Sequence, residues 1–262
     1  MLRYGNPGSA HTWPPRHCAT LRATLTCPLN EGVESLWSKA AVDKSAFNAG
    51  VHLPFDLRLS DFEVAMGDVY DFFPDVNALL SGKGLHRLDD MMRPAALSGM
   101  ISDMMTASLA KFSRALVENR HFNGHPDLIL RGKYADDAIA SGEQGIEIKS
   151  TRKAGGAVDM HGARKQWMCV FVYEVDNVTE PAVNRAPMRF TEVYVGQVAE
   201  ADFRSNARST LGTRTATLHA QGIKKLRANW VYKLAAPVTG AAKVEAAAGL
   251  KPGTIKAKPV ER

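Results

Sequence analysis

Apolar residues recur with a helical period over residues 96–120. Their spacing predicts an amphipathic helix with one face packed on a core. That face comprises Leu97, Ile101, Met104, Met105, Leu109, Phe112 and Leu116. Upstream, shorter apolar runs over residues 33–90 are interrupted by Pro54, Pro74 and the Gly82–Gly84 turn. These runs predict a small helical lead-in.

Further along the chain the pattern changes to short apolar segments typical of strands. Residues 127–134 and 145–150 are joined by a polar, glycine-containing stretch, so we expect adjacent strands, most simply a hairpin. A short helical or looped piece then leads to residues 168–175, whose unbroken apolar run predicts a strand buried on both faces at the sheet centre. Residues 189–198 predict a further strand, and residues 219–233 predict a helix or turn ending in a short strand.

This order of helix, strands, crossover and strand predicts the α/β class. We expect an extended or disordered arm over residues 1–30 and the helical lead-in over residues 31–93. A core over residues 94–234 follows, with a basic C-terminal part, and residues 235–262 are expected to form a flexible basic tail.

The cysteines and the apolar runs bear on the compartment. Cys18, Cys27 and Cys169 are too few for a disulfide framework, so a reducing, cytoplasmic location is expected. With His11 and His17, the first two offer four zinc ligands, but no Cys-x-x-Cys pair is present and no zinc site is expected. No apolar window approaches a membrane span, so we expect neither membrane insertion nor secretion.

Charge is unevenly distributed along the chain. The net charge is +6, from 33 basic and 27 acidic residues. Residues 31–90 contain eleven acids and five bases, whereas residues 203–233 contain seven bases and no acid. The basic segment favours a polyanion, most commonly nucleic acid, although a solvated basic face is the alternative. Its bases are Arg204, Arg208, Arg214, Lys224, Lys225, Arg227 and Lys233.

The chemistry is expected where the two predicted neighbouring strands meet. Pro126 and Asp127 open the first strand, and Glu147 and Lys149 lie in the second strand, with twenty positions between the two acids. Pairing of these strands would bring the two carboxylates together, with Lys149 on the same side as Glu147. Buried carboxylates are costly unless they are paired or bind a cation, and Mg²⁺ prefers oxygen ligands.

Two observations limit this interpretation. A second Pro-Asp pair, Pro74-Asp75, has no acid-x-Lys triplet after it, so the dipeptide alone carries little information. As an alternative, Pro126-Asp127 begins a turn and Glu147 pairs with Lys149 on a half-exposed strand. The combination of helix, Pro-Asp strand, fixed separation and apolar acid-x-Lys strand favours the catalytic interpretation.

Residues 97–175 resemble the PD-(D/E)xK nuclease superfamily, which includes many restriction endonucleases. The resemblance implies a mixed central sheet flanked by helices. It also implies Asp127, Glu147 and the carbonyl of Ile148 as Mg²⁺ ligands, with Lys149 positioning the attacking water.

The resemblance extends to residues outside the central triplet. Some members add an acid from the preceding helix, for which Glu118 is favoured over Asp103. Several members also place a glutamine on the crossover, where Gln166 is similar in position. Phosphate or base contacts are expected from bases after the triplet and from the basic segment. These bases are Arg152, Lys153, Arg164, Lys165, Arg208, Arg214 and Lys224.

The resulting expectation is a Mg²⁺-dependent endodeoxyribonuclease that acts on double-stranded DNA, with a type II restriction endonuclease as the leading interpretation. The resemblance implies 5′-phosphate and 3′-hydroxyl products. Cleavage of palindromes would require a two-fold homodimer. The alternatives are a repair, phage or mobile-element nuclease with little sequence preference, a non-catalytic DNA-binding module of the same fold, and an unrelated α/β protein with an accidental motif.

Overall fold

The computed structural model describes residues 38–153, 158–160, 162–205 and 215–235. Its helices are α1 (Leu59–Gly82), α2 (Leu88–Met91), α3 (Pro94–Phe112) and α4 (Ala220–Ala228), and its 3₁₀ helices are η1 (Lys44–Ala46), η2 (Ala135–Asp137), η3 (Ala182–Asn184) and η4 (Glu200–Asp202). Its strands are β1 (Leu116–Glu118), β2 (Leu128–Leu130), β3 (Gly145–Thr151), β4 (Asp159–Met160), β5 (Gln166–Glu174), β6 (Arg189–Val198), β7 (Phe203–Ser205), β8 (Ala216–Leu218) and β9 (Trp230–Lys233).

A six-stranded mixed sheet organises the described chain. Its strand order is β1-β2-β3-β5-β6-β9, and β3 and β5 run parallel while the other described neighbours are antiparallel. This sheet confirms the predicted α/β class. The predicted adjacency of residues 127–134 and 145–150 is also confirmed, because Leu128 pairs with Ile146.

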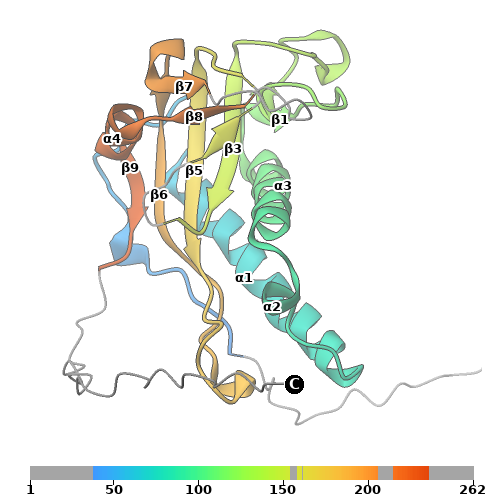
Figure 1. Ribbon diagram of the computed structural model, residues 1–262. Coiled ribbons are helices and arrows are strands. Elements are labelled where there is room, and N and C mark those ends of the chain that lie inside the picture. The colour runs from blue at the N-terminus through green and yellow to red at the C-terminus, as the bar shows by residue number, and fades with distance from the viewer. Residues whose placement is uncertain (1–37, 154–157, 161, 206–214, 236–262) are drawn as a thin grey trace, which may run out of the picture. The chain divides into compact units, whose positions relative to one another are not determined.

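Two apolar layers cover opposite faces of this sheet. Helices α1 and α3 pack on one face, and a three-stranded sheet of order β4-β8-β7 packs with α4 on the other (Figure 1). Strand β5 serves both layers because successive strand side chains point to opposite faces. Cys169, Phe171 and Tyr173 join the helical layer, and Met168, Val170 and Val172 join the other. The prediction of a doubly buried central strand is therefore confirmed.

Helix α1 continues through Pro74, where the sequence pattern predicted an interruption. A proline inside a helix removes one backbone hydrogen bond. Contacts on both sides of it hold this helix in place. Before the proline, the Tyr70 hydroxyl accepts a hydrogen bond from Phe190 N at 2.8 Å; after it, Asn77 Oδ1 accepts one from Leu88 N at 2.8 Å. Tertiary packing therefore overrides the local signal.

Helix α3 is shorter than its predicted range of residues 96–120. It ends at Phe112, and the Ser113 hydroxyl accepts a hydrogen bond from Leu116 N at 3.0 Å as the chain turns into β1. Leu116 is fully buried in the sheet, although its spacing from Phe112 also fits a helix. Periodicity therefore could not detect the turn, and Glu118 lies on a strand instead of a helix.

The crossover from β3 to β5 was expected to be a short helical or looped piece, and its described residues contain no helix. Its described residues include β4, which pairs with β8 in the small sheet. The predicted arm, most of the predicted tail and the four residues weighed as zinc ligands lie outside the described residues. Within the described ranges, no helix is long and apolar enough to cross a membrane.

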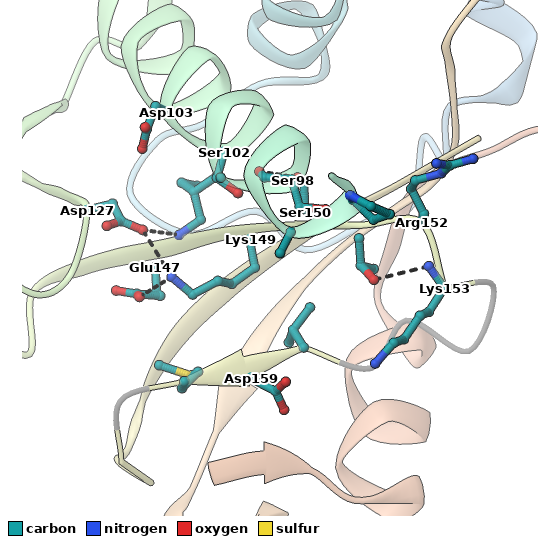
Figure 2. A pocket seen from close by; sticks show the side chains of 17 residues that line it. Ser98, Ser102, Asp103, Asp127, Glu147, Lys149, Ser150, Arg152, Lys153 and Asp159 are labelled. Atoms are coloured by element: carbon teal, nitrogen blue, oxygen red, sulfur yellow. Dashed lines mark hydrogen bonds and ion pairs between the residues drawn. The ribbon is translucent and has the colours of Figure 1, made fainter. Parts of the chain in front are cut away.

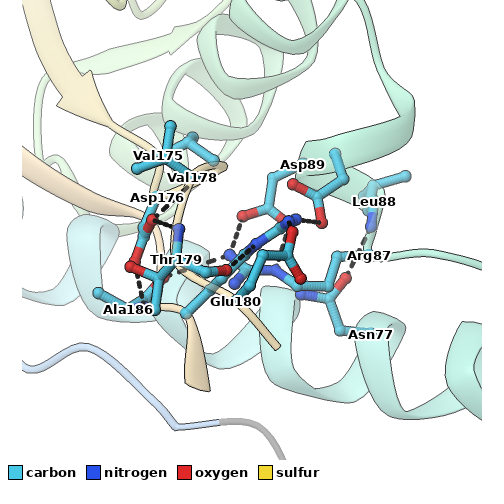
Figure 3. Close-up of polar contacts among 12 residues, drawn as sticks. Asn77, Arg87, Leu88, Asp89, Val175, Asp176, Val178, Thr179, Glu180 and Ala186 are labelled. Carbon is cyan, nitrogen blue, oxygen red and sulfur yellow. Dashed lines mark hydrogen bonds and ion pairs between the residues drawn. The ribbon is translucent and has the colours of Figure 1, made fainter. Parts of the chain in front are cut away.

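Polar contacts fasten the turn between β5 and β6 to the helical layer (Figure 3). Asp176 accepts hydrogen bonds from the backbone of Val178, Thr179 and Ala186, which hold the pKa of its carboxyl well below the ordinary value. Next to it, Arg87 and Asp89 form a buried ion pair, and Arg87 Nη2 donates to Ala186 O at 3.3 Å. The turn is thus fixed to the segment that precedes α3.

Candidate functional site

The candidate site lies where β2 and β3 separate. The register that pairs Leu128 with Ile146 brings Asp127 beside Glu147. Asp127 directly precedes β2, and its Oδ2 accepts a hydrogen bond from Ile148 N at 2.8 Å. Because the N–H and C=O of one strand residue project toward the same side, the Ile148 carbonyl also faces this gap.

A glycine permits this close approach. A Cβ atom at Gly145 would lie 2.0 Å from Leu128 O and 2.6 Å from Pro126 Cγ. Any larger residue must therefore push β2 away from β3. The resulting shift would move Asp127 relative to Glu147, so Gly145 is required for the geometry of the site.

Three charged side chains converge at the gap (Figure 2). Lys149 Nζ lies 2.6 Å from Glu147 Oε1 and 3.9 Å from Asp127 Oδ2. The Glu147 side chain is only 1% exposed, whereas the Asp127 and Lys149 side chains are 29% and 25% exposed. The sequence-predicted triplet is thus brought together, with its most buried carboxylate at the base of the site.

The environment shifts the pKa values of these three side chains in different directions. Burial, with a smaller contribution from the Glu147 charge, raises the pKa of Asp127 to about 6. Burial would also raise the pKa of Glu147, but the hydrogen bond from His125 and the charge of Lys149 outweigh it and lower that pKa. The two carboxylates outweigh burial at Lys149 and raise its pKa. Glu147 and Lys149 therefore stay charged at neutral pH, whereas Asp127 gains or loses its proton near pH 6.

The donor set is suited to a divalent cation. One potential ligand atom from each of His125, Asp127 and Glu147 lies within 4.8 Å of the others. Glu147 Oε1 is fully buried and accepts no well-directed hydrogen bond, although it contacts the Lys149 ammonium. A single lysine does not neutralise two carboxylates, and a bound cation would lower the cost of burying both.

The site opens into a cavity of about 730 Å³. Helix α3 supplies one wall with Ser98, Ser102 and Asp103, and β3 and β4 supply others (Figure 2). Arg152 and Lys153 line the cavity beyond the end of β3. Asp103, Asp127 and Glu147 therefore lie with Lys149 at one end, and Arg152 and Lys153 lie at the other; Asp159 of β4 also lines the cavity.

The expectation that Glu118 is the acid on the preceding helix is wrong, because Glu118 lies on β1; Asp103, the alternative, lies on α3. Glu118 is exposed on β1 and is not among the residues lining the cavity. Asp103 lines the cavity from α3, and its charge contributes to the raised pKa of Lys149. The error follows from the misplaced end of α3, because the sequence pattern carried the helix past residue 118.

Gln166 lies outside the cavity, at the first position of β5 and not on a helical crossover. Its Nε2 lies 3.1 Å from Met160 Sδ, and its residue borders a different, smaller cavity together with Lys165. The structure therefore gives Gln166 no contact with the three charged groups that converge at the gap.

The predicted DNA-contacting bases are dispersed. Arg152 and Lys153 line the cavity, Lys224 is exposed on α4, and Arg164 lies just before β5. Arg208 and Arg214 fall outside the described residues. Acidic partners also offset part of the basic segment, since Lys225 pairs with Asp202 at 2.8 Å and Arg227 with Glu192 at 2.7 Å.

One important residue was missed in the sequence. The Asn119 amide Nδ2 donates to Pro126 O at 3.0 Å and to Ile139 O at 2.9 Å, while Asn119 N donates to Asp127 O at 2.9 Å. These bonds clamp the segment that carries Asp127 against the loop before β3. A lone asparagine after a short strand has no motif, so its role becomes visible only in three dimensions.

Comparisons with protein-family models, with curated proteins and with solved structures find no significant match. The functional inference therefore depends on the geometry and chemistry of the site.

Proposed function

We propose that this protein is a metal-dependent endodeoxyribonuclease with a restriction-endonuclease-like core. The observation that carries the proposal is the convergence of Asp127, Glu147 and Lys149 at the gap between β2 and β3. Within this class, a type II restriction endonuclease acting on double-stranded DNA is our leading candidate.

The order of elements around the triplet supports the proposal. Helix α3 precedes three antiparallel strands, β1, β2 and β3, and β5 then pairs in parallel with β3. The helix, the Pro-Asp strand, the acid-x-Lys strand and the apolar strand follow the order implied by the resemblance to PD-(D/E)xK nucleases. Strand β1 is additional, and the described part of the crossover contains β4 where that resemblance implies a helix.

Asp127, Glu147 and the carbonyl of Ile148 would hold the cation. When bound, a divalent cation such as Mg²⁺ would supply charge neutralisation at the scissile phosphate and lower the pKa of an attacking water. Asp127 titrates near pH 6 in the metal-free protein, so it is largely ionised and available as a ligand at neutral pH.

Lys149 would orient the attacking water and place positive charge beside the phosphate. Its pKa is raised, so the ammonium stays protonated at neutral pH and acts as a hydrogen-bond donor instead of a general base. Its contacts with both carboxylates fix the ammonium at the cation site.

The basic end of the cavity would bind DNA beyond the scissile bond. Arg152 and Lys153 line that end, and both side chains can contact phosphate oxygens. A DNA strand bound in this way would have its reacting phosphate at Asp127 and Glu147 and a flanking phosphate at Arg152 and Lys153.

The direct test is cleavage of supercoiled and genomic DNA with Mg²⁺, Mn²⁺ or chelator. Wild-type protein is compared with Asp127→Ala and Lys149→Ala, and the fragment ends are sequenced. We expect cation-dependent cutting that both substitutions abolish, with 5′-phosphate ends that share a short motif. If the wild type cuts neither unmodified nor modified DNA, the proposal is overturned.

Two alternatives give different results in the same experiment. A nuclease with little sequence preference would produce ends without a shared motif. A non-catalytic DNA-binding module would bind DNA in chelator, with strong salt dependence, and would not cut with any cation. The intact set of two acids and a lysine favours catalysis over binding alone.

A further inference from the structure

His125 lies in the cluster but has no part in the mechanism above. Its Nδ1 is 3.2 Å from Glu147 Oε2, and its side chain is 22% exposed. The imidazole therefore adjoins the most buried carboxylate and still reaches the solvent side of the site. It supplies a nitrogen to a donor set that otherwise consists of oxygens.

The backbone of His125 is held in place on both sides. His125 N donates to Ala140 O at 3.2 Å, and Gly142 N donates to His125 O at 2.8 Å. The next residue, Pro126, is held by the Asn119 amide. The imidazole is thus carried by a fixed segment, as required of a group that helps define a ligand site.

The spacing of the donor atoms fits coordination of one ion. Two ligands bound at a right angle, each about 2.1 Å from the ion, lie about 3 Å apart. The separation of 3.2 Å between His125 Nδ1 and Glu147 Oε2 is close to that spacing. The limit of 4.8 Å among the ligand atoms of His125, Asp127 and Glu147 also accommodates ligands on opposite sides of an ion.

We propose that His125 is a third side-chain ligand of the cation and makes the site prefer a first-row transition ion, represented by Mn²⁺, over Mg²⁺. The inference rests on the cation site of the proposed function. Mg²⁺ binds oxygen ligands and dehydrates reluctantly, whereas imidazole suits transition ions. Two carboxylates with one imidazole therefore favour an ion such as Mn²⁺, which accepts both kinds of ligand.

A different role for His125 makes a different prediction. If the imidazole only holds the Glu147 carboxylate by a hydrogen bond, no nitrogen will be bonded to the ion. Loss of His125 would then weaken the binding of Mn²⁺ and the binding of Mg²⁺ by similar factors. Metal selectivity and nitrogen coordination therefore separate a ligand from a positioning residue.

The test is pulsed electron paramagnetic resonance of full-length protein with one equivalent of Mn²⁺, together with calorimetric titrations of Mn²⁺ and Mg²⁺. The spectra are recorded for the wild type, for protein with ¹⁵N-labelled histidine, and for His125→Ala. His121→Ala is the matched control because His121 is exposed in the same loop.

We expect coupling of the ion to an imidazole nitrogen in the wild type and in His121→Ala, with the isotope shift in the labelled protein. His125→Ala should lack this coupling, and its preference for Mn²⁺ over Mg²⁺ should fall by about tenfold or more. Absence of coupling in the wild type, or its persistence in His125→Ala, would overturn the inference. If His125→Ala does not fold, the labelled wild-type spectrum still decides whether any histidine binds the ion.

The inference and the proposed nuclease function fail in different ways. Nitrogen coordination without DNA cleavage would support the cation site and contradict the proposed nuclease function. Cleavage with Mg²⁺ but no nitrogen coupling to Mn²⁺ would support the nuclease function and contradict the assignment of His125 as a ligand. Asp127→Asn identifies the site in both cases, because it should weaken binding of either ion.

Discussion

At the residue scale, the site combines carboxylates whose pKa values are shifted in opposite directions. Glu147 lies beside His125 and Lys149 and retains its charge, whereas burial raises the pKa of Asp127 to about 6. The two acids therefore share one environment but interact with different partners. Without a cation, an ionised Asp127 destabilises the fold, and a bound cation would remove that cost.

Asp127→Asn is expected to stabilise the metal-free protein at about pH 7.5, by up to about 3 kcal/mol. The ordinary Asp pKa of 3.8 is raised to about 6, so the folded protein holds this proton more tightly than the unfolded chain. The wild-type cost is present above pH 6 and disappears as the pH falls toward about 4. Denaturant unfolding of both proteins in chelator across this range checks the prediction, and a pH-independent difference would contradict it.

Gly145→Ala is expected to destabilise the fold by about 1–3 kcal/mol, because its Cβ would meet Leu128 O and Pro126. Gly67→Ala in α1 is the matched control, since an added Cβ there meets no atom within 4 Å. The control should be neutral or stabilising by up to about 1 kcal/mol. Urea unfolding measures both, and equal effects of the two substitutions would refute the close-approach argument.

At the element scale, patterns within strands predicted more than patterns at element ends. The apolar run of β5 and the Pro-Asp and acid-x-Lys segments predicted the sheet centre and the β2–β3 pair, since both depend on local composition. The end of α3 was missed because Leu116 continues the helical spacing while it is buried in β1. That single error favoured Glu118 over Asp103 as the expected helix acid.

Contacts between distant segments were also beyond sequence reasoning. The Asn119 clamp joins residues 119, 126 and 139, and no periodic pattern records such a bond. Continuation of α1 through Pro74 likewise depends on Tyr70 and Phe190, which are far apart in the chain. The sequence could predict which charged residues converge at the gap, but not which residues hold them in place.

The pair between Arg87 and Asp89 gives a prediction at this scale. Arg87→Ala should destabilise the protein by about 3–5 kcal/mol, because it leaves a buried carboxylate without its ion-pair partner. The double variant Arg87→Met, Asp89→Leu should regain much of this loss. Arg189→Ala breaks an exposed pair with Glu174 and should cost less than about 1 kcal/mol. Thermal unfolding of all three compares them, and a small loss in Arg87→Ala would count against a buried structural pair.

At the scale of the whole molecule, net positive charge alone does not locate the proposed DNA-contacting surface. Part of the basic segment is paired with acids, as for Lys225 and Arg227. Besides Lys149, the bases that line the site cavity are Arg152 and Lys153, directly after the acid-x-Lys strand. The expected contact surface is therefore centred on this cavity.

Lys153→Ala should weaken DNA binding. It should also reduce the magnitude of the slope of log affinity against log salt concentration by about 1, the change expected for loss of one phosphate contact. Lys83→Ala, at the exposed end of α1, should leave both quantities unchanged. Fluorescence anisotropy with a labelled duplex in chelator, over a series of salt concentrations, measures the two variants. Equal salt slopes in Lys153→Ala and the wild type would exclude a phosphate contact by this lysine.

The most direct test of the central claim compares cation binding and DNA cleavage in Lys149→Met. This substitution retains the proposed ligands but removes the ammonium 2.6 Å from Glu147. We predict that Lys149→Met binds Mn²⁺ at least as tightly as the wild type does. Its single-turnover cleavage rate should be lower than that of the wild type by about 100-fold or more. Lys133→Met, at an exposed position outside the cavity, should match the wild type in both measurements. Wild-type cleavage rates in Lys149→Met, or no cation-dependent cleavage by the wild type, would contradict the assignment of this site as a nuclease centre.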